Sequence, residues 1–192
     1  MEDRILDEIG LEARRLMPHS GTHGFEHTLR VYNTCRRIGI STGADLSVLL
    51  PAALLHDVAR DEAEHNNASS MKAREILISL NYPRDKIESV ARAISAHSFT
   101  GGLAPDSLEA EILSDADKLD AMGALGVYRA AMYSGEKGRP IEEFIAHFHE
   151  KLLKLKEKLH TEEAKCIADS KHRFMLFFLE QLSKEQSLDS QA

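Results

Sequence analysis

The chain has 192 residues, 43% of them hydrophobic, and a formal net charge of −7 with its ten histidines counted as neutral. This length suits one domain with its own core, and the acidic balance excludes the broad basic surface that binds a nucleic-acid polymer. No apolar run reaches the roughly 18 residues of a membrane span. The first residues lack the apolar stretch of a signal peptide. We therefore expect a cytoplasmic protein that binds neither membranes nor nucleic acids.

Helical periodicity runs along the whole chain. Apolar residues recur at three- and four-residue steps, which is typical of one buried helix face, in the segments 5–16, 25–40, 47–59, 87–97, 141–159 and 175–182. Turn-forming residues separate them at 18–24, 41–45, 81–85, 99–107 and 134–140. We predict an all-α domain over residues 1–186, with about eight or nine helices and a polar tail at 187–192.

The segment 47–59 is apolar on nearly every face, which indicates a helix in the middle of a bundle. His56 and Asp57 lie side by side at its end. A buried carboxylate needs a cationic partner, and a metal ion is one such partner. For an isolated His-Asp dipeptide, a structural Asp–His or Asp–Arg pair is by far the better explanation.

Other residues of the kinds that bind metals lie on both sides of His56 and Asp57 in the sequence. His27 precedes His56 by 29 positions, and Asp115, Asp117 and Asp120 crowd together downstream. Like charges so close need a nearby cation, which Lys118 supplies in part. A structural alternative is open for Asp117, because Ser114 and Asp117 have the spacing of a capping box.

The order His27, His56-Asp57, Asp117 resembles the H…HD…D signature of the HD-domain metal-dependent phosphohydrolase superfamily. The words "HTLRVYN", "LLHDVARD", "AISAHSF", "DADKLDAMGALGVYRA" and "HFHEKLLKL" are similar to those of small bacterial and archaeal HD hydrolases. The resemblance covers nearly the whole chain. It implies an all-α HD-domain, PDEase-like bundle with a metal held between its helices.

The resemblance also implies a ligand set and one divalent metal ion. His27 matches the first ligand, His56 and Asp57 the doublet, and Asp117 the last aspartate, with Asp115 as the fallback. Mixed imidazole and carboxylate ligands suit Mn, Fe, Co, Ni or Zn, with Mg as a further candidate. Such an ion lowers the pKa of a bound water and neutralises charge on a phosphoryl group.

Other residues are candidates for roles around this ion. Asp61 matches an acidic position that orients water in some relatives, although Arg60 replaces the acidic residue often found just before it. Lys118 is the second catalytic candidate. The candidate substrate contacts are His23, Arg30, His97 and Arg129. His97 could equally be a core histidine, whereas a salt-bridged surface residue is the favoured interpretation of Arg129.

These inferences predict a phosphohydrolase that cleaves a phosphate ester or anhydride of a small substrate, most simply a nucleotide. A phosphodiesterase for cyclic or signalling nucleotides is one alternative, and a catalytically silent metal- or nucleotide-binding module is another. The spacing of His65 and His97 along the chain does not match a two-metal centre, so we expect one metal. The sequence does not specify the oligomeric state.

Overall fold

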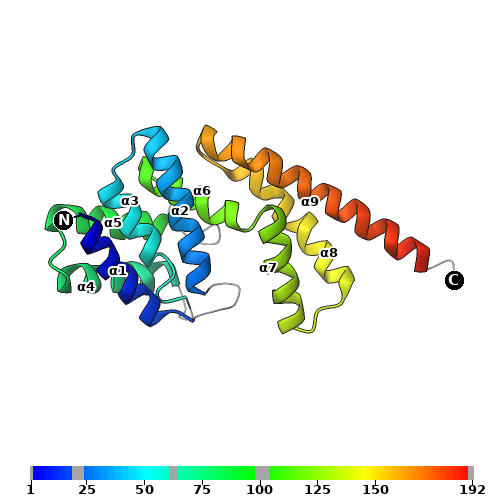
Figure 1. The fold of residues 1–192 in the computed structure, drawn as a ribbon, viewed down its shortest axis with the longest axis horizontal. Helices are drawn as coiled ribbons and strands as arrows, with labels where there is room; N and C mark the ends of the chain where they lie inside the picture. Colours follow the sequence, from blue (N-terminus) through cyan, green and yellow to red (C-terminus); the bar gives the residue numbers. More distant parts are fainter. Residues whose placement is uncertain (1, 19–23, 61–64, 98–103, 190–192) are drawn as a thin grey trace. The chain divides into compact units, whose positions relative to one another are not determined.

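The computed structural model describes residues 2–18, 24–60, 65–97 and 104–189. Over these residues the fold has no strand, which confirms the all-α prediction. The helices are α1 (Glu2–Leu16), α2 (Phe25–Thr42), α3 (Leu46–Leu55), α4 (His65–Ser79), α5 (Arg84–Ala96), α6 (Leu108–Asp120), α7 (Gly123–Glu136), α8 (Ile141–Glu150), the 3₁₀ helix η1 (Leu152–Lys158) and α9 (Glu162–Asp189) (Figure 1). None of the helices described is both long and apolar enough to cross a membrane.

The chain divides into two compact units, Met1–Asp117 and Lys118–Ala192. In the first unit, α3 is the central helix and packs against α1, α2, α4 and α5. Its side chains are buried from Val48 to Leu55, as its apolar sequence predicts. The single-domain boundary at residue 186 stays a prediction, and α9 continues past it to Asp189.

A proline lies inside α3, and a distant tyrosine compensates for it. Pro51 has no N–H, so the Ser47 carbonyl one turn earlier lacks its usual helical donor. Tyr82 donates its hydroxyl hydrogen to this carbonyl across 2.5 Å. The turn between α4 and α5 therefore stabilises the central helix.

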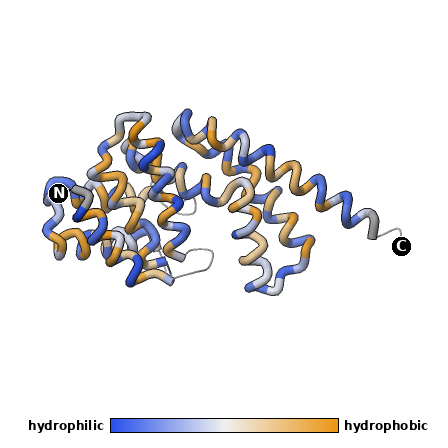
Figure 2. The backbone as a smooth tube through the Cα atoms, viewed as in Figure 1, coloured by the Kyte–Doolittle hydropathy of each residue, from blue (hydrophilic) through white to orange (hydrophobic). Residues whose placement is uncertain are grey.

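The second unit is built from α7, α8, η1 and α9, with α7 packed on α9 and η1 in contact with α8 and α9. Phe144, Phe148 and Phe178 form its aromatic cluster, with ring centroids 5.1–6.2 Å apart. Hydrophilic and hydrophobic residues alternate along α9 (Figure 2), whose buried face includes Ala164, Ala168 and Met175.

The prediction of one continuous helix over 141–159 is wrong. The backbone at Lys151 has φ −130° and ψ −61°, which ends α8 at Glu150, and the chain then tightens into η1. The apolar stripe survives this change, since Phe148, Leu152 and Leu155 are all buried. Side-chain periodicity alone does not distinguish the two kinds of helix here.

Candidate metal centre

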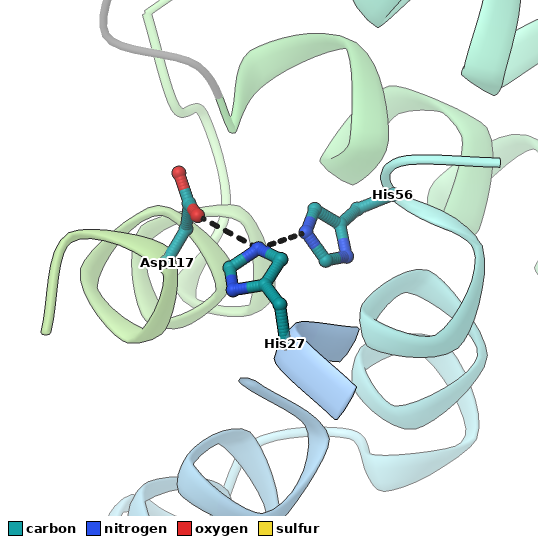
Figure 3. A group of neighbouring side chains, drawn as sticks. All are labelled: His27, His56 and Asp117. Carbon is teal, nitrogen blue, oxygen red and sulfur yellow. Dashed lines mark hydrogen bonds and ion pairs between the residues drawn. The ribbon is translucent and has the colours of Figure 1, made fainter. Parts of the chain in front are cut away.

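Two histidines meet from the ends of two helices. His27 lies in the first turn of α2, and His56 is the residue that ends α3. Both side chains are fully buried, and their Nε2 atoms are 3.3 Å apart (Figure 3). The central helix ends four residues earlier than residue 59, its predicted end, and residues 56–60 form turns.

The ring of His56 is held by its own helix. Its Nδ1 lies 2.8 Å from the carbonyl oxygen of Ala53. A carbonyl oxygen only accepts, so the proton is on Nδ1 and the lone pair of Nε2 faces His27. This is the usual way in which a backbone carbonyl orients a metal-binding imidazole.

Two carboxylates complete the cluster. Asp117, on α6, places Oδ1 3.3 Å from His27 Nε2 (Figure 3). Asp57 is almost fully buried, and its Oδ2 lies 3.9 Å from His27 Nε2 and 3.8 Å from His56 Nε2. The structure thus brings together all four residues that the resemblance proposes as ligands.

The distances around His27 and His56 suit metal ligands. Ligands about 2.1 Å from a metal lie roughly 3.0 Å apart at right angles and roughly 4.2 Å apart on opposite sides. The four separations given above, from 3.3 to 3.9 Å, fall within this range. The described residues include two sets of donors that could hold a metal ion, and one is His27, His56 and Asp117.

The second donor set contains His97, which was predicted as a substrate contact. Its members are His56, Asp57 and His97. His97 ends α5 and is buried, and its Nε2 lies 3.8 Å from Asp57 Oδ1. Its ring packs edge-on against His56, with centroids 5.1 Å apart. In the fold, His97 therefore adjoins the predicted ligands directly.

Burial controls the charges in this cluster. Burial lowers the pKa of His56 although Asp57 opposes the shift, and it lowers the pKa of His97 with help from His56. Burial by itself raises the pKa of Asp117, but the hydrogen bond and positive charge of His27 outweigh it, so this pKa is lowered. The neutral forms of His56 and His97 and the ionised form of Asp117 are the ones that bind a metal.

Comparison with known families matches residues 24–122 to the HD domain, a stretch that contains all four predicted ligands. The chain belongs to the HD domain family. The uncharacterized protein YpgQ of Bacillus subtilis is similar, with 35% identity over 179 residues that cover 88% of this chain and 87% of YpgQ.

Solved structures agree with this assignment. The structure of Bacillus subtilis YpgQ in complex with ADP is 31% identical, with a TM-score of 0.81 over 94% of this chain and 97% of YpgQ. An HD-superfamily hydrolase from Bacillus thuringiensis is 31% identical, with a TM-score of 0.81 over 97% of this chain and 99% of the hydrolase.

The acidic end of α6 in this HD domain is not a helix cap. Ser107 caps α6 by accepting the Ala110 N–H, so the alternative that placed Ser114 in a capping box is wrong. Ser114 lies inside the helix and donates to the His97 carbonyl across 2.8 Å. The fallback ligand Asp115 is fully buried but belongs to neither donor set.

Of the other predicted catalytic and substrate-binding residues, some lie near the predicted ligands in the sequence and some lie outside the described residues. Lys118 follows Asp117 on α6 and is mostly buried. Arg30 is partly exposed on α2, one turn after His27. His23 and Asp61 lie outside the described residues.

Arg129 forms an ion pair with Asp120, at 2.8 Å from Nη1 to Oδ2. Both side chains are largely buried, with 11% and 4% exposed. The ion pair agrees with the salt-bridge interpretation of Arg129, but the expected surface position is wrong because the side chain is largely buried. The role of Arg129 toward a substrate stays a prediction.

The sequence does not indicate that Arg60 lies beside the predicted ligand Asp57. Its Nη1 lies 3.2 Å from Asp57 Oδ1, and 35% of its side chain is exposed. Its position three residues after Asp57 was the available signal.

Proposed function

We propose that this HD domain protein is a metal-dependent phosphohydrolase acting on a nucleotide, with His27, His56, Asp57 and Asp117 as ligands of one divalent ion. The observation that carries the proposal is that His56 and both carboxylates lie 3.3 to 3.9 Å from His27 Nε2, with Asp57 also 3.8 Å from His56 Nε2. Four buried or partly buried ionisable groups are costly to bring together unless a cation joins them.

The donor set narrows the choice of metal. Two nitrogen and two oxygen donors suit Mn, Fe, Co, Ni or Zn more than calcium, and Mg is accessible through the carboxylates. When bound, such an ion supplies a Lewis acid for a phosphate oxygen and a water of lowered pKa.

The protein contributes orientation and charge around that ion. The Ala53 carbonyl fixes the tautomer of His56, and burial keeps its imidazole neutral and ready to bind a metal. We assign Lys118 and Arg30 to the substrate phosphates, because an ammonium or guanidinium group neutralises phosphoryl charge. His23, His97 and the water-orienting Asp61 stay proposals from the family resemblance, and Arg129 stays a proposal because a guanidinium group matches phosphate oxygens.

The nature of the substrate rests on two observations. YpgQ, which matches nearly the whole chain, has been crystallised in complex with ADP. The net charge of −7 argues against a polymeric polyanion and in favour of a small one. A nucleoside phosphate is consistent with both observations. A catalytically silent nucleotide-binding module is the second candidate, because a bound nucleotide does not itself demonstrate turnover.

Metal analysis combined with product analysis tests the proposal. The wild type is compared with Asp57→Ala and with Asp7→Ala, which removes an exposed carboxylate from α1. Metal content is measured by mass spectrometry, and phosphate and pyrophosphate release are measured on nucleoside mono-, di- and triphosphates and cyclic nucleotides with Mn.

About one metal per chain is expected in the wild type and in Asp7→Ala, together with product release. Asp57→Ala should lose both. Release of phosphate, of pyrophosphate or of an opened cyclic nucleotide identifies the bond cleaved. Metal binding without any turnover would favour the silent module, and a metal-free wild type after Mn addition would overturn the proposal.

A further inference from the structure

The carboxylate of Asp57 faces positive or metal-binding groups on two sides. Its Oδ2 faces the imidazoles of His27 and His56, at 3.9 and 3.8 Å. Its Oδ1 faces Arg60 Nη1 at 3.2 Å and His97 Nε2 at 3.8 Å. One buried carboxylate thus adjoins two positions that can hold a cation.

The position on the Oδ1 side adjoins the second donor set, which consists of His56, Asp57 and His97. His97 keeps its proton on Nδ1, which lies 2.5 Å from the Ile94 carbonyl, so its Nε2 lone pair points away from its helix. Ser114 holds the same residue from α6 by donating to its backbone carbonyl. The separation of 3.8 Å between Nε2 and Asp57 Oδ1 suits two ligands of one ion.

Arg60 already places a positive charge on this side. A guanidinium is permanently protonated and has no lone pair for a metal, so it contacts Asp57 Oδ1 as a cation and not as a ligand. A dication beside His97 would share the same carboxylate oxygen and would be repelled by the guanidinium. The metal and the guanidinium therefore exclude each other at this oxygen.

We propose that Arg60 serves as the second cation of the centre and limits it to one metal ion. Without Arg60, His97 and Asp57 form the core of a second metal site, with Asp57 bridging the two ions. The inference rests on the proposed function, because it takes His27, His56, Asp57 and Asp117 as the first site. It assigns to Arg60 and His97 the control of metal number.

Metal stoichiometry tests this inference without any assay of activity. Full-length wild type, Arg60→Ala, Arg60→Lys and the double variant Arg60→Ala/His97→Gln are stripped with a chelator and titrated with Mn by calorimetry. Bound Mn is counted by mass spectrometry, and electron paramagnetic resonance distinguishes an isolated ion from an exchange-coupled pair. Circular dichroism confirms folding. Arg60 is partly exposed, so its substitution should be tolerated.

The wild type and Arg60→Lys, which keeps the charge, should bind about one Mn, whereas Arg60→Ala should bind about two, close enough to couple. Adding His97→Gln should restore about one, because Gln replaces an imidazole donor with a neutral amide. Two ions in the wild type, or one ion in Arg60→Ala, would overturn the inference and leave the proposed function standing. Absence of Mn from all four proteins would instead overturn the proposed function.

Discussion

His56 and His97 hold their imidazole rings through the same contact. Each residue ends a helix, α3 or α5, and each places Nδ1 against the carbonyl three residues earlier, at 2.8 Å for His56 and 2.5 Å for His97. The two rings then pack edge-on with an interplanar angle of 83°. A helix end that fixes an imidazole tautomer thus occurs twice beside one carboxylate, Asp57.

This arrangement predicts how stability depends on pH. Burial lowers the pKa of His97, so the folded state resists protonation that the unfolded state accepts. The wild type should therefore lose stability as pH falls below the ordinary histidine pKa of about 6.5, by at most about 1.4 kcal/mol per pH unit for this group. His97→Gln lacks this loss. The unfolding free energies of the two metal-free proteins should converge on acidification.

Urea unfolding in the presence of a chelator, from pH 8 to pH 5, measures this convergence. The wild type should be the more stable protein at pH 8, because His97 is buried and bonded to Ile94. A gap between the two proteins that widens as pH falls would contradict the neutral buried imidazole.

The carboxylate that caps α3 gives a pH dependence in the same direction, but in a more acidic range. Asp45 accepts the Ser47 N–H across 2.9 Å, and Lys86 approaches its other oxygen at 2.6 Å. The hydrogen bond from Lys86, helped by Ser47, lowers the pKa of Asp45. Asp45→Ala should cost about 1 kcal/mol at pH 7, the usual value of such a cap.

Asp45→Asn is the matched control for that cap, because an amide oxygen still accepts the Ser47 N–H while the charge is lost. A lowered folded-state pKa contributes stability above the unfolded value of about 3.9. This stability is lost as pH falls through the folded pKa. The difference in stability between wild type and Asp45→Asn should therefore be smaller at pH 3 than at pH 7, as thermal unfolding at the two pH values would show. An unchanged difference at pH 3 would exclude the charge as its cause.

The sequence predicted the features that depend only on local composition and on the order of residues along the chain. The apolar run of α3 predicts a central helix because such a surface is stable only when covered on all sides. The predicted ligands His27, His56, Asp57 and Asp117 do meet, and the family signature already contained that information. Fold class and family membership were predicted correctly on these grounds.

The sequence could not specify the contacts that depend on tertiary packing. His97 lies 40 positions after Asp57, and only the packing of α5 on α3 brings them together. Spacing along the chain therefore does not show that His97 lies beside Asp57. The early end of α3 is equally hidden, because the residues around it keep helical composition while the backbone turns.

A glycine at the start of α7 provides a test of local packing. An added Cβ at Gly126 would lie 2.3 Å from the backbone oxygen of Ala121, which cannot move like a flexible side chain. Gly126→Ala should destabilise the protein by about 1–3 kcal/mol, the usual cost of overpacking. The same change at Gly135, in the last turn of α7, meets no atom within 4 Å. Gly135→Ala should be neutral or stabilising by up to about 1 kcal/mol.

Thermal and denaturant unfolding of these two variants measure the difference. Both substitutions add the same methyl group to the same helix, so helix propensity cancels between them. Equal stability of the two variants would contradict the close approach of Gly126 to Ala121.

The ion pair of Asp120 and Arg129 joins the end of α6 to α7 and decides how Arg129 should be interpreted. Because both side chains are largely buried, removal of one partner leaves an uncompensated charge and should cost about 3–5 kcal/mol. Asp120→Asn and Arg129→Met should each be destabilising in urea unfolding, and the double variant Asp120→Leu/Arg129→Met should recover much of the loss.

Nucleotide affinity separates this structural role from a role in substrate binding. Calorimetric titration with ADP in the presence of Mn is made on the wild type and on the double variant. If Arg129 acts only through Asp120, the affinity should stay within about twofold, because the paired charges are removed together. A tenfold or greater weakening, equivalent to about 1.4 kcal/mol of binding free energy, would show that the guanidinium contacts the nucleotide.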